Sequence, residues 1–118
     1  AMSRALPLNI DDHPVRQWAI SELRRNDPAT VLGAATSLMR FSSHAWIGEV
    51  DVPTAVVVTA RDRLVPVHRQ EKLAAAIPGA TVHVVDADHD AAGNVGNKFV
   101  PVLLDACASV TSRTRASR

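Results

Sequence analysis

The hydrophobic residues of the chain change their spacing near its middle. In the first half they recur at steps of three and four residues, which places them on one face of an α-helix. The first predicted helix carries four such residues: Val15, Trp18, Ala19 and Leu23. Asp27 followed by Pro28 is an N-cap with proline at the first helical position, so a second helix is predicted from there to about Phe41.

The second half alternates between continuous apolar runs and helical spacing. Residues 54–59 and 80–85 are runs rich in valine, which is typical of strands that are covered on both faces. Residues 67–77 and 98–110 have the composition and spacing of helices. The predicted fold class is therefore α/β, with an N-terminal helical segment followed by a β-α-β-α unit that contains two parallel strands.

This order of elements divides the chain into three parts. We expect a helical segment over residues 1–45, a β-α-β-α part over residues 46–110, and a disordered tail of mainly serine, threonine and arginine over residues 111–118. Two strands do not complete a sheet, and each leaves an edge with unpaired backbone groups. The chain is therefore expected to be a homo-oligomer in which strand edges of two copies pair.

Composition narrows the class of protein. A chain of 118 residues with 47% hydrophobic and 21% charged residues suits one small globular domain. A net charge of +1 and 3% aromatic residues give no basis for nucleic-acid binding. The sequence shows no apolar run of membrane-spanning length and no signal-peptide pattern. The single cysteine, Cys107, is expected to be a small core residue, and a cytoplasmic location is expected.

Candidate chemistry lies at the ends of the two predicted strands. Asp62 follows the first strand and His89 follows the second, and the C-terminal ends of parallel strands are where reacting groups collect. Imidazole, with an ordinary pKa of about 6.5, suits a general base, and a carboxylate on its second nitrogen fixes the tautomer. Asp followed by His is also the order of the last two members of a Ser…Asp…His triad.

Residues 46–110 resemble the C-terminal part of an α/β-hydrolase. The resemblance lies in four segments: Val52-Pro53-Thr54, Asp62-Arg63-Leu64-Val65-Pro66, Ile77-Pro78-Gly79-Ala80 and the His89 loop. It implies that Asp62 is the triad acid and His89 the triad base, that residues 1–45 correspond to a helical cap, and that a small acyl or ester substrate is hydrolysed without a cofactor. No Gly-x-Ser-x-Gly elbow occurs in the chain, so the serine would lie upstream, and the chain alone is expected to be inactive.

Other roles for these residues stay open. Asp62 can instead cap the following helix or pair with Arg61 or Arg63, and His89 can belong to a solvated acidic loop. The apolar side of the two N-terminal helices can line an acyl pocket, although an apolar stripe at helical spacing more often belongs to a core. The alternative function, of a different class, is a non-catalytic relic or an interaction module that pairs through exposed strand edges.

A metal site is not expected. Asp86, Asp88 and Asp90 alternate as in a calcium-binding loop, but the EF-hand requires glycine directly after the third acid and glutamate at the twelfth position. This chain has Ala91 and Asn97 there. Its histidines do not follow a recognised zinc-ligand spacing.

Overall fold

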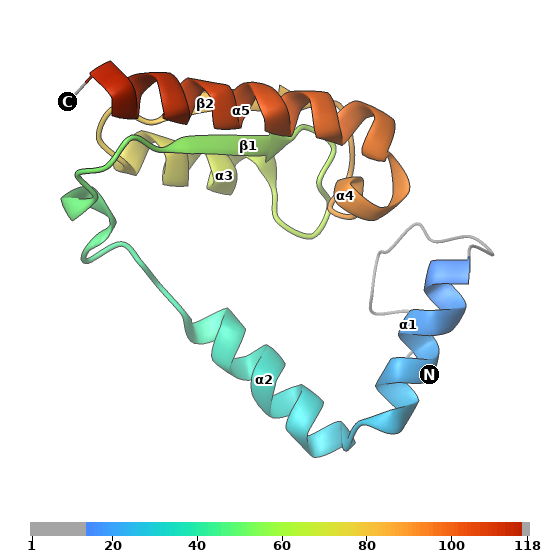
Figure 1. Ribbon diagram of the computed structural model, residues 1–118. Helices are drawn as coiled ribbons and strands as arrows, with labels where there is room; N and C mark the ends of the chain where they lie inside the picture. The colour runs from blue at the N-terminus through green and yellow to red at the C-terminus, as the bar shows by residue number, and fades with distance from the viewer. Residues whose placement is uncertain (1–13, 117–118) are drawn as a thin grey trace. The chain divides into compact units, whose positions relative to one another are not determined.

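The computed structural model describes residues 14–116, which belong to two compact units. Residues 14–43 contain two helices, and residues 44–116 contain a short 3₁₀ turn, two strands and three helices (Figure 1). In chain order these are α1 (Pro14–Arg25), α2 (Pro28–Arg40), η2 (Ile47–Glu49), β1 (Ala55–Thr59), α3 (Val67–Ala76), β2 (Thr81–Val85), α4 (Ala91–Asn94) and α5 (Gly96–Ala116). The predicted α/β class with two parallel strands is confirmed. None of the described helices combines the length and apolar character needed to cross a membrane.

The predicted start of the second helix is confirmed. The carboxylate of Asp27 accepts hydrogen bonds from the hydroxyl and the backbone N–H of Thr30, both at 2.9 Å. These bonds, the hydroxyl bond foremost, lower the pKa of Asp27. The apolar side of α2 does not form the expected core, since Leu38 is 76% and Met39 87% exposed and no residue of α2 is buried. Local capping therefore defines where α2 begins, without tertiary packing on its apolar residues.

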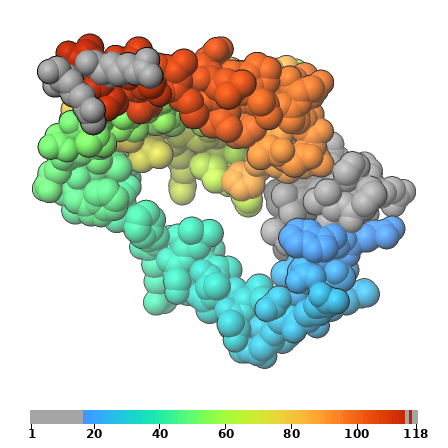
Figure 2. Space-filling view, viewed as in Figure 1, coloured from blue at the N-terminus to red at the C-terminus, as the bar shows by residue number. Residues whose placement is uncertain are grey.

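The sheet is the middle of three layers in the second unit. Strands β1 and β2 run parallel with Ala55 opposite Thr81 and Thr59 opposite Val85. Helix α5 lies along one face of the sheet and α3 packs on the other face of β1 (Figure 1). The space-filling view shows the atoms of α5, in orange and red, directly against green and yellow atoms of the preceding part of this unit (Figure 2). The core on the α5 side contains these residues: Val85, Ala87 and Ala91, with Val57, Val95, Phe99 and Val102 packed against them.

The two strands are covered to different extents. Val58 of β1 is 2% exposed, whereas Val82 and Val84 of β2 are 50% and 59% exposed. The expectation that both strands are covered on both faces is therefore wrong for β2. The reason is the placement of α3, which packs mainly on β1 and leaves the same face of β2 open.

The C-terminal residues also differ from the prediction. Helix α5 extends to Ala116, so residues 111–116 are helical rather than a disordered tail, and residues 117–118 lie outside the described part. The guanidinium of Arg113 donates to the carbonyl oxygens of Gly79 (2.7 Å) and Thr54 (2.8 Å), which ties the last turns of α5 to the start of both strands. Cys107 on this helix is exposed and is not the core residue expected.

One edge of β1 has no neighbouring strand within the described residues. Thr54 and Ala60, at the two ends of β1, bond to the β2 side. Because residues of a parallel strand alternate between its two edges, Ala55, Val57 and Thr59 direct their backbone groups to the open edge. This edge borders the candidate site.

Candidate functional site

The carboxylate of Asp62 is buried and held by hydrogen bonds from its own loop; its side chain is 3% exposed. Oδ1 accepts from the backbone N–H groups of Leu64 (2.9 Å) and Val65 (2.7 Å), and Oδ2 accepts from the Thr59 hydroxyl (2.8 Å). Burial by itself would raise the pKa of Asp62, but the hydrogen bonds it accepts, first that of Val65, outweigh burial and lower the pKa below its ordinary value. Asp62 is therefore an oriented, ionised acceptor at neutral pH.

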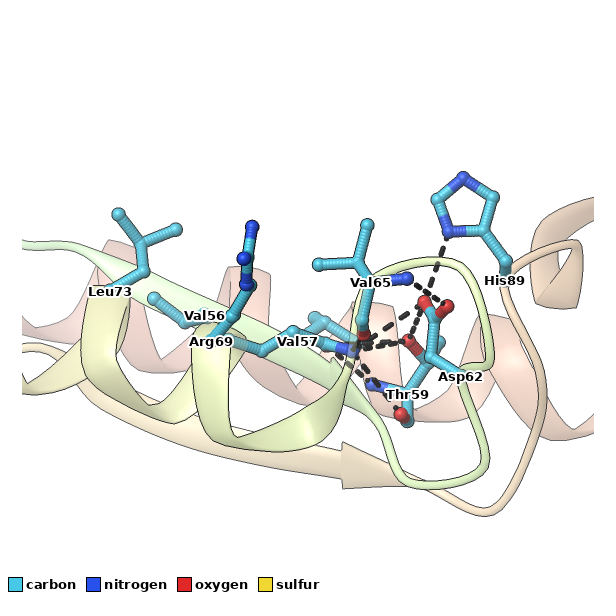
Figure 3. A pocket seen from close by; sticks show the side chains of 9 residues that line it. Val56, Val57, Thr59, Asp62, Val65, Arg69, Leu73 and His89 are labelled. Carbon is cyan, nitrogen blue, oxygen red and sulfur yellow. Dashed lines mark hydrogen bonds and ion pairs between the residues drawn. The ribbon is translucent and has the colours of Figure 1, made fainter. Parts of the chain in front are cut away.

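His89 faces this carboxylate from the loop after β2. Its Nδ1 lies 3.0 Å from Oδ2 of Asp62, while Nε2 points away from the carboxylate (Figure 3). An ionised carboxylate only accepts hydrogen bonds, so it selects the tautomer with the proton on Nδ1. The His89 side chain is 43% exposed, so Nε2 is left as an accessible proton acceptor.

Two ion pairs join the loop after β1 to the loop after β2. Arg61 donates to Asp86 (Nη2 to Oδ2, 2.6 Å) and Arg63 donates to Asp88 (Nε to Oδ2, 2.7 Å). Exposed pairs of this kind contribute little individually. Asp88 makes further hydrogen bonds besides its ion pair, because its Oδ1 accepts from the backbone N–H groups of His89 (2.8 Å) and Arg63 (3.1 Å). These bonds, that of His89 foremost, lower the pKa of Asp88 and connect the backbones of both loops.

These contacts show which partners the charged side chains of the two loops have. Arg61 and Arg63 pair with Asp86 and Asp88, and Asp62 is turned instead to His89. Among residues 14–116, no group of three or more histidine, cysteine, aspartate or glutamate side chains is placed to hold a metal ion. The structure thus brings Asp62 and His89 together, as the order of strands predicts.

An open pocket of about 320 Å³ lies beside the pair. Four apolar residues contribute to its lining: Val56, Val57, Val65 and Leu73. Asp62, His89 and Arg69 contribute its charged and titratable groups, and Figure 3 shows Leu73, Arg69, Val65 and His89 pointing to the same side. The pocket follows the open edge of β1, so a ligand there would have an apolar surface on one side and the imidazole at one end.

Gln70 and Asp88 also belong to this arrangement, although nothing in the sequence pattern singles them out. Gln70 lies in a helix where glutamine is an ordinary residue, and its contact with the Asp62 loop arises only because α3 packs on β1. Asp88 belongs to a row of three alternating aspartates, which is typical of a solvated acidic loop. The one local signal was Thr59, a hydroxyl placed three residues before Asp62 at the end of the predicted strand.

Comparison of the chain with protein-family models, with curated proteins and with solved structures found no match. The interpretation of the site therefore depends on its geometry.

Proposed function

We propose that the chain is the C-terminal part of a serine-type α/β-hydrolase, in which Asp62 orients His89 as the base for acyl or ester hydrolysis. The observation that supports this is the 3.0 Å contact between Asp62 Oδ2 and His89 Nδ1, with Nε2 turned to the open side. Both the burial of the acid and the exposure of the base suit these roles, because the acid must stay fixed while the base must reach a substrate.

In the proposed reaction, Nε2 of His89 takes the proton of a serine hydroxyl as its oxygen attacks the acyl carbon. Asp62 keeps the other ring proton on Nδ1 and stabilises the imidazolium that forms. His89 then returns the proton to the leaving group, and water repeats the sequence on the acyl-enzyme. The serine lies outside this sequence, and the apolar part of a small substrate occupies the pocket along β1. The free thiol of Cys107 suits a cytoplasmic setting.

The test uses the protein extended upstream by its natural coding sequence. We expect an in-frame Gly-x-Ser-x-Gly motif, labelling of that serine by a fluorophosphonate probe, and turnover of a short-chain chromogenic ester. Asp62→Asn and His89→Ala should each lower kcat/KM by about 10³-fold or more, and the double variant should be little worse than the worse single variant.

The matched control is His68→Ala, which replaces an exposed histidine of α3 and should keep wild-type turnover. A stop codon directly upstream, or losses that simply multiply in the double variant, would contradict the proposal. The 118-residue chain alone should show neither labelling nor turnover, because it lacks the elbow.

A second candidate function is that of an interaction module which forms a homo-oligomer. It is favoured by the open edge of β1, with the backbone groups of Ala55 and Val57 directed outward, and by the exposure of Val82 and Val84. Light scattering coupled to gel filtration tests it. A mass near 12.6 kDa over a wide concentration range would exclude self-association of the chain.

A further inference from the structure

The side-chain amide of Gln70 joins the end of β1 to the Asp62 loop. Its Oε1 accepts from the backbone N–H of Thr59 at 2.9 Å. Its Nε2 donates to the carbonyl oxygen of Val65 at 2.8 Å and lies 3.1 Å from the Thr59 hydroxyl and 3.5 Å from Oδ2 of Asp62. One helical side chain therefore contacts the strand end and both sides of the loop that carries the acid.

These contacts fix the direction of the hydrogen bonds. A backbone N–H can only donate, so the amide oxygen must face Thr59 N and the amide nitrogen must face the carbonyl of Val65. The second amide proton is shared between the Thr59 hydroxyl (3.1 Å) and the Thr59 carbonyl oxygen (3.3 Å). The Thr59 hydroxyl lies 2.8 Å from Oδ2 of Asp62 and 3.3 Å from Gln70 Oε1, so the shorter contact assigns its proton to Asp62. The result is a chain of donors that runs from Gln70 through Thr59 to Asp62, the carboxylate that His89 faces.

Gln70 also closes one position of the open strand edge. Of the three residues of β1 that face this edge, Thr59 has its N–H bonded to Gln70 Oε1, and its carbonyl oxygen accepts from Asp62 N (3.2 Å) and Gln70 Nε2 (3.3 Å). A strand that paired along β1 would find free groups at Ala55 and Val57 but none at Thr59. The space next to the acid–base pair is thereby kept clear of an added backbone.

We propose that Gln70 is a positioning residue for the Asp62–His89 pair, acting through Thr59, and that it ends strand pairing on the open edge of β1 before the pair is reached. This inference rests on the proposed function, because Gln70 can position a catalytic pair only if Asp62 and His89 act as acid and base. A merely structural role would hold α3 on β1 and leave the geometry of His89 unaffected.

The experiment observes the ring nitrogens of His89 by NMR in the ¹⁵N-labelled chain, with every variant measured at the same mildly alkaline pH. The exchange rate of the Nδ1 proton with water reports the hydrogen bond to Asp62. The exchange rate of the Val58 backbone amide, in the same sample, reports opening of the whole sheet. Gln70→Ala removes the amide contacts, Thr59→Val replaces the hydroxyl by a methyl group, and Glu71→Ala replaces an exposed neighbour on α3 as the control.

We expect the wild-type chain and Glu71→Ala to hold the proton on Nδ1. In Gln70→Ala and Thr59→Val the Nδ1 proton should exchange about tenfold faster, the change expected for losing one hydrogen bond, beyond any change at Val58. Equal changes at Nδ1 and Val58 would show a structural role only and overturn the inference. So would an unchanged Nδ1 exchange rate in both variants. Absence of the Nδ1 proton in the wild-type chain would instead contradict the Asp62–His89 pair itself, and with it the proposed function.

Discussion

In the unit that begins at residue 44, Val58 and Val85 are each 2% exposed, while in the helical unit Leu38 is 76% and Met39 87% exposed. Both regions have apolar residues at the spacing their elements require. In the first region, two helices cover the faces of β1 and the apolar side chains are buried between layers. In the helical unit, no residue of α2 is buried.

The two units also differ in the hydrogen-bond partners of their aspartates. Asp62 is buried, and its two oxygens accept at least four hydrogen bonds from three different segments, the strand end, its own loop and the loop after β2. Asp27 is exposed, and its carboxylate accepts hydrogen bonds from Thr30, within its own helix. Where layers pack together, a polar side chain can bond to residues that are distant in the sequence. Such bonds hold the side chain in a defined position within a site.

The largest effect should come from the packed strand. Val58→Ala removes two methyl groups from a fully buried position and should lower the free energy of unfolding by about 2 kcal/mol. Met39→Ala removes a larger side chain from α2 but should change the free energy of unfolding by less than about 0.5 kcal/mol. Urea unfolding measures both variants. A comparable loss for Met39→Ala would show that α2 packs on a partner surface.

The next largest effect concerns the end of α5. Arg113→Ala removes hydrogen bonds to the carbonyl oxygens of Gly79 and Thr54 and should lower the free energy of unfolding by about 1 kcal/mol. The last turns of α5 should lose amide protection first, because these bonds join them to the sheet. The control on the same helix is the exposed Lys98→Ala, which should have wild-type stability and protection. Unchanged protection in Arg113→Ala would mean that α5 needs no such anchor.

Acid should weaken the packed unit through its buried carboxylate. The folded-state pKa of Asp62 is lowered below the unfolded value of about 3.9, so the unfolded chain binds protons more readily in acid. The stabilisation that the ionised Asp62 carboxylate contributes is complete above the unfolded-state pKa and is lost as the pH falls through the folded-state pKa. Thermal unfolding from about pH 6 down to pH 2 should therefore show a smaller dependence on pH in Asp62→Asn. Asp51→Asn, at an exposed position, is the control, and equal pH dependence in wild type and Asp62→Asn would exclude this contribution.

The smallest effect should be confined to the helical unit. Asp27→Ala removes the N-cap of α2 and should lower its helix content, because no tertiary packing compensates for the lost bonds to Thr30. NMR secondary chemical shifts of residues 28–40 measure the change. The exchange protection of the Val58 amide should stay the same, and a parallel loss there would show that the two units fold together.

Much of the fold could be predicted from local patterns. The valine runs predict both strands, Asp27-Pro28 predicts the start of α2, and the order of elements predicts that Asp62 and His89 follow neighbouring strand ends. The predictions from sequence are wrong where the structure of a segment depends on contacts with residues distant in the sequence. Residues 111–116 have a tail-like composition, yet Arg113 finds carbonyl acceptors at the start of both strands and α5 continues.

The sequence by itself determined the two strands, most of the longer helices and which chemistry is present at the strand ends, because capping, β-branched runs and helical spacing act within a few neighbouring residues. Only the tertiary structure decided which partners the charged groups have. Whether Asp62 pairs with Arg61 or with His89, and whether Gln70 is a surface residue or a contact of the Asp62 loop, depends on how α3 and the loop after β2 lie against β1. Hydrogen bonds reach only about 3 Å, so the packing of layers selects among partners that the sequence alone leaves equivalent.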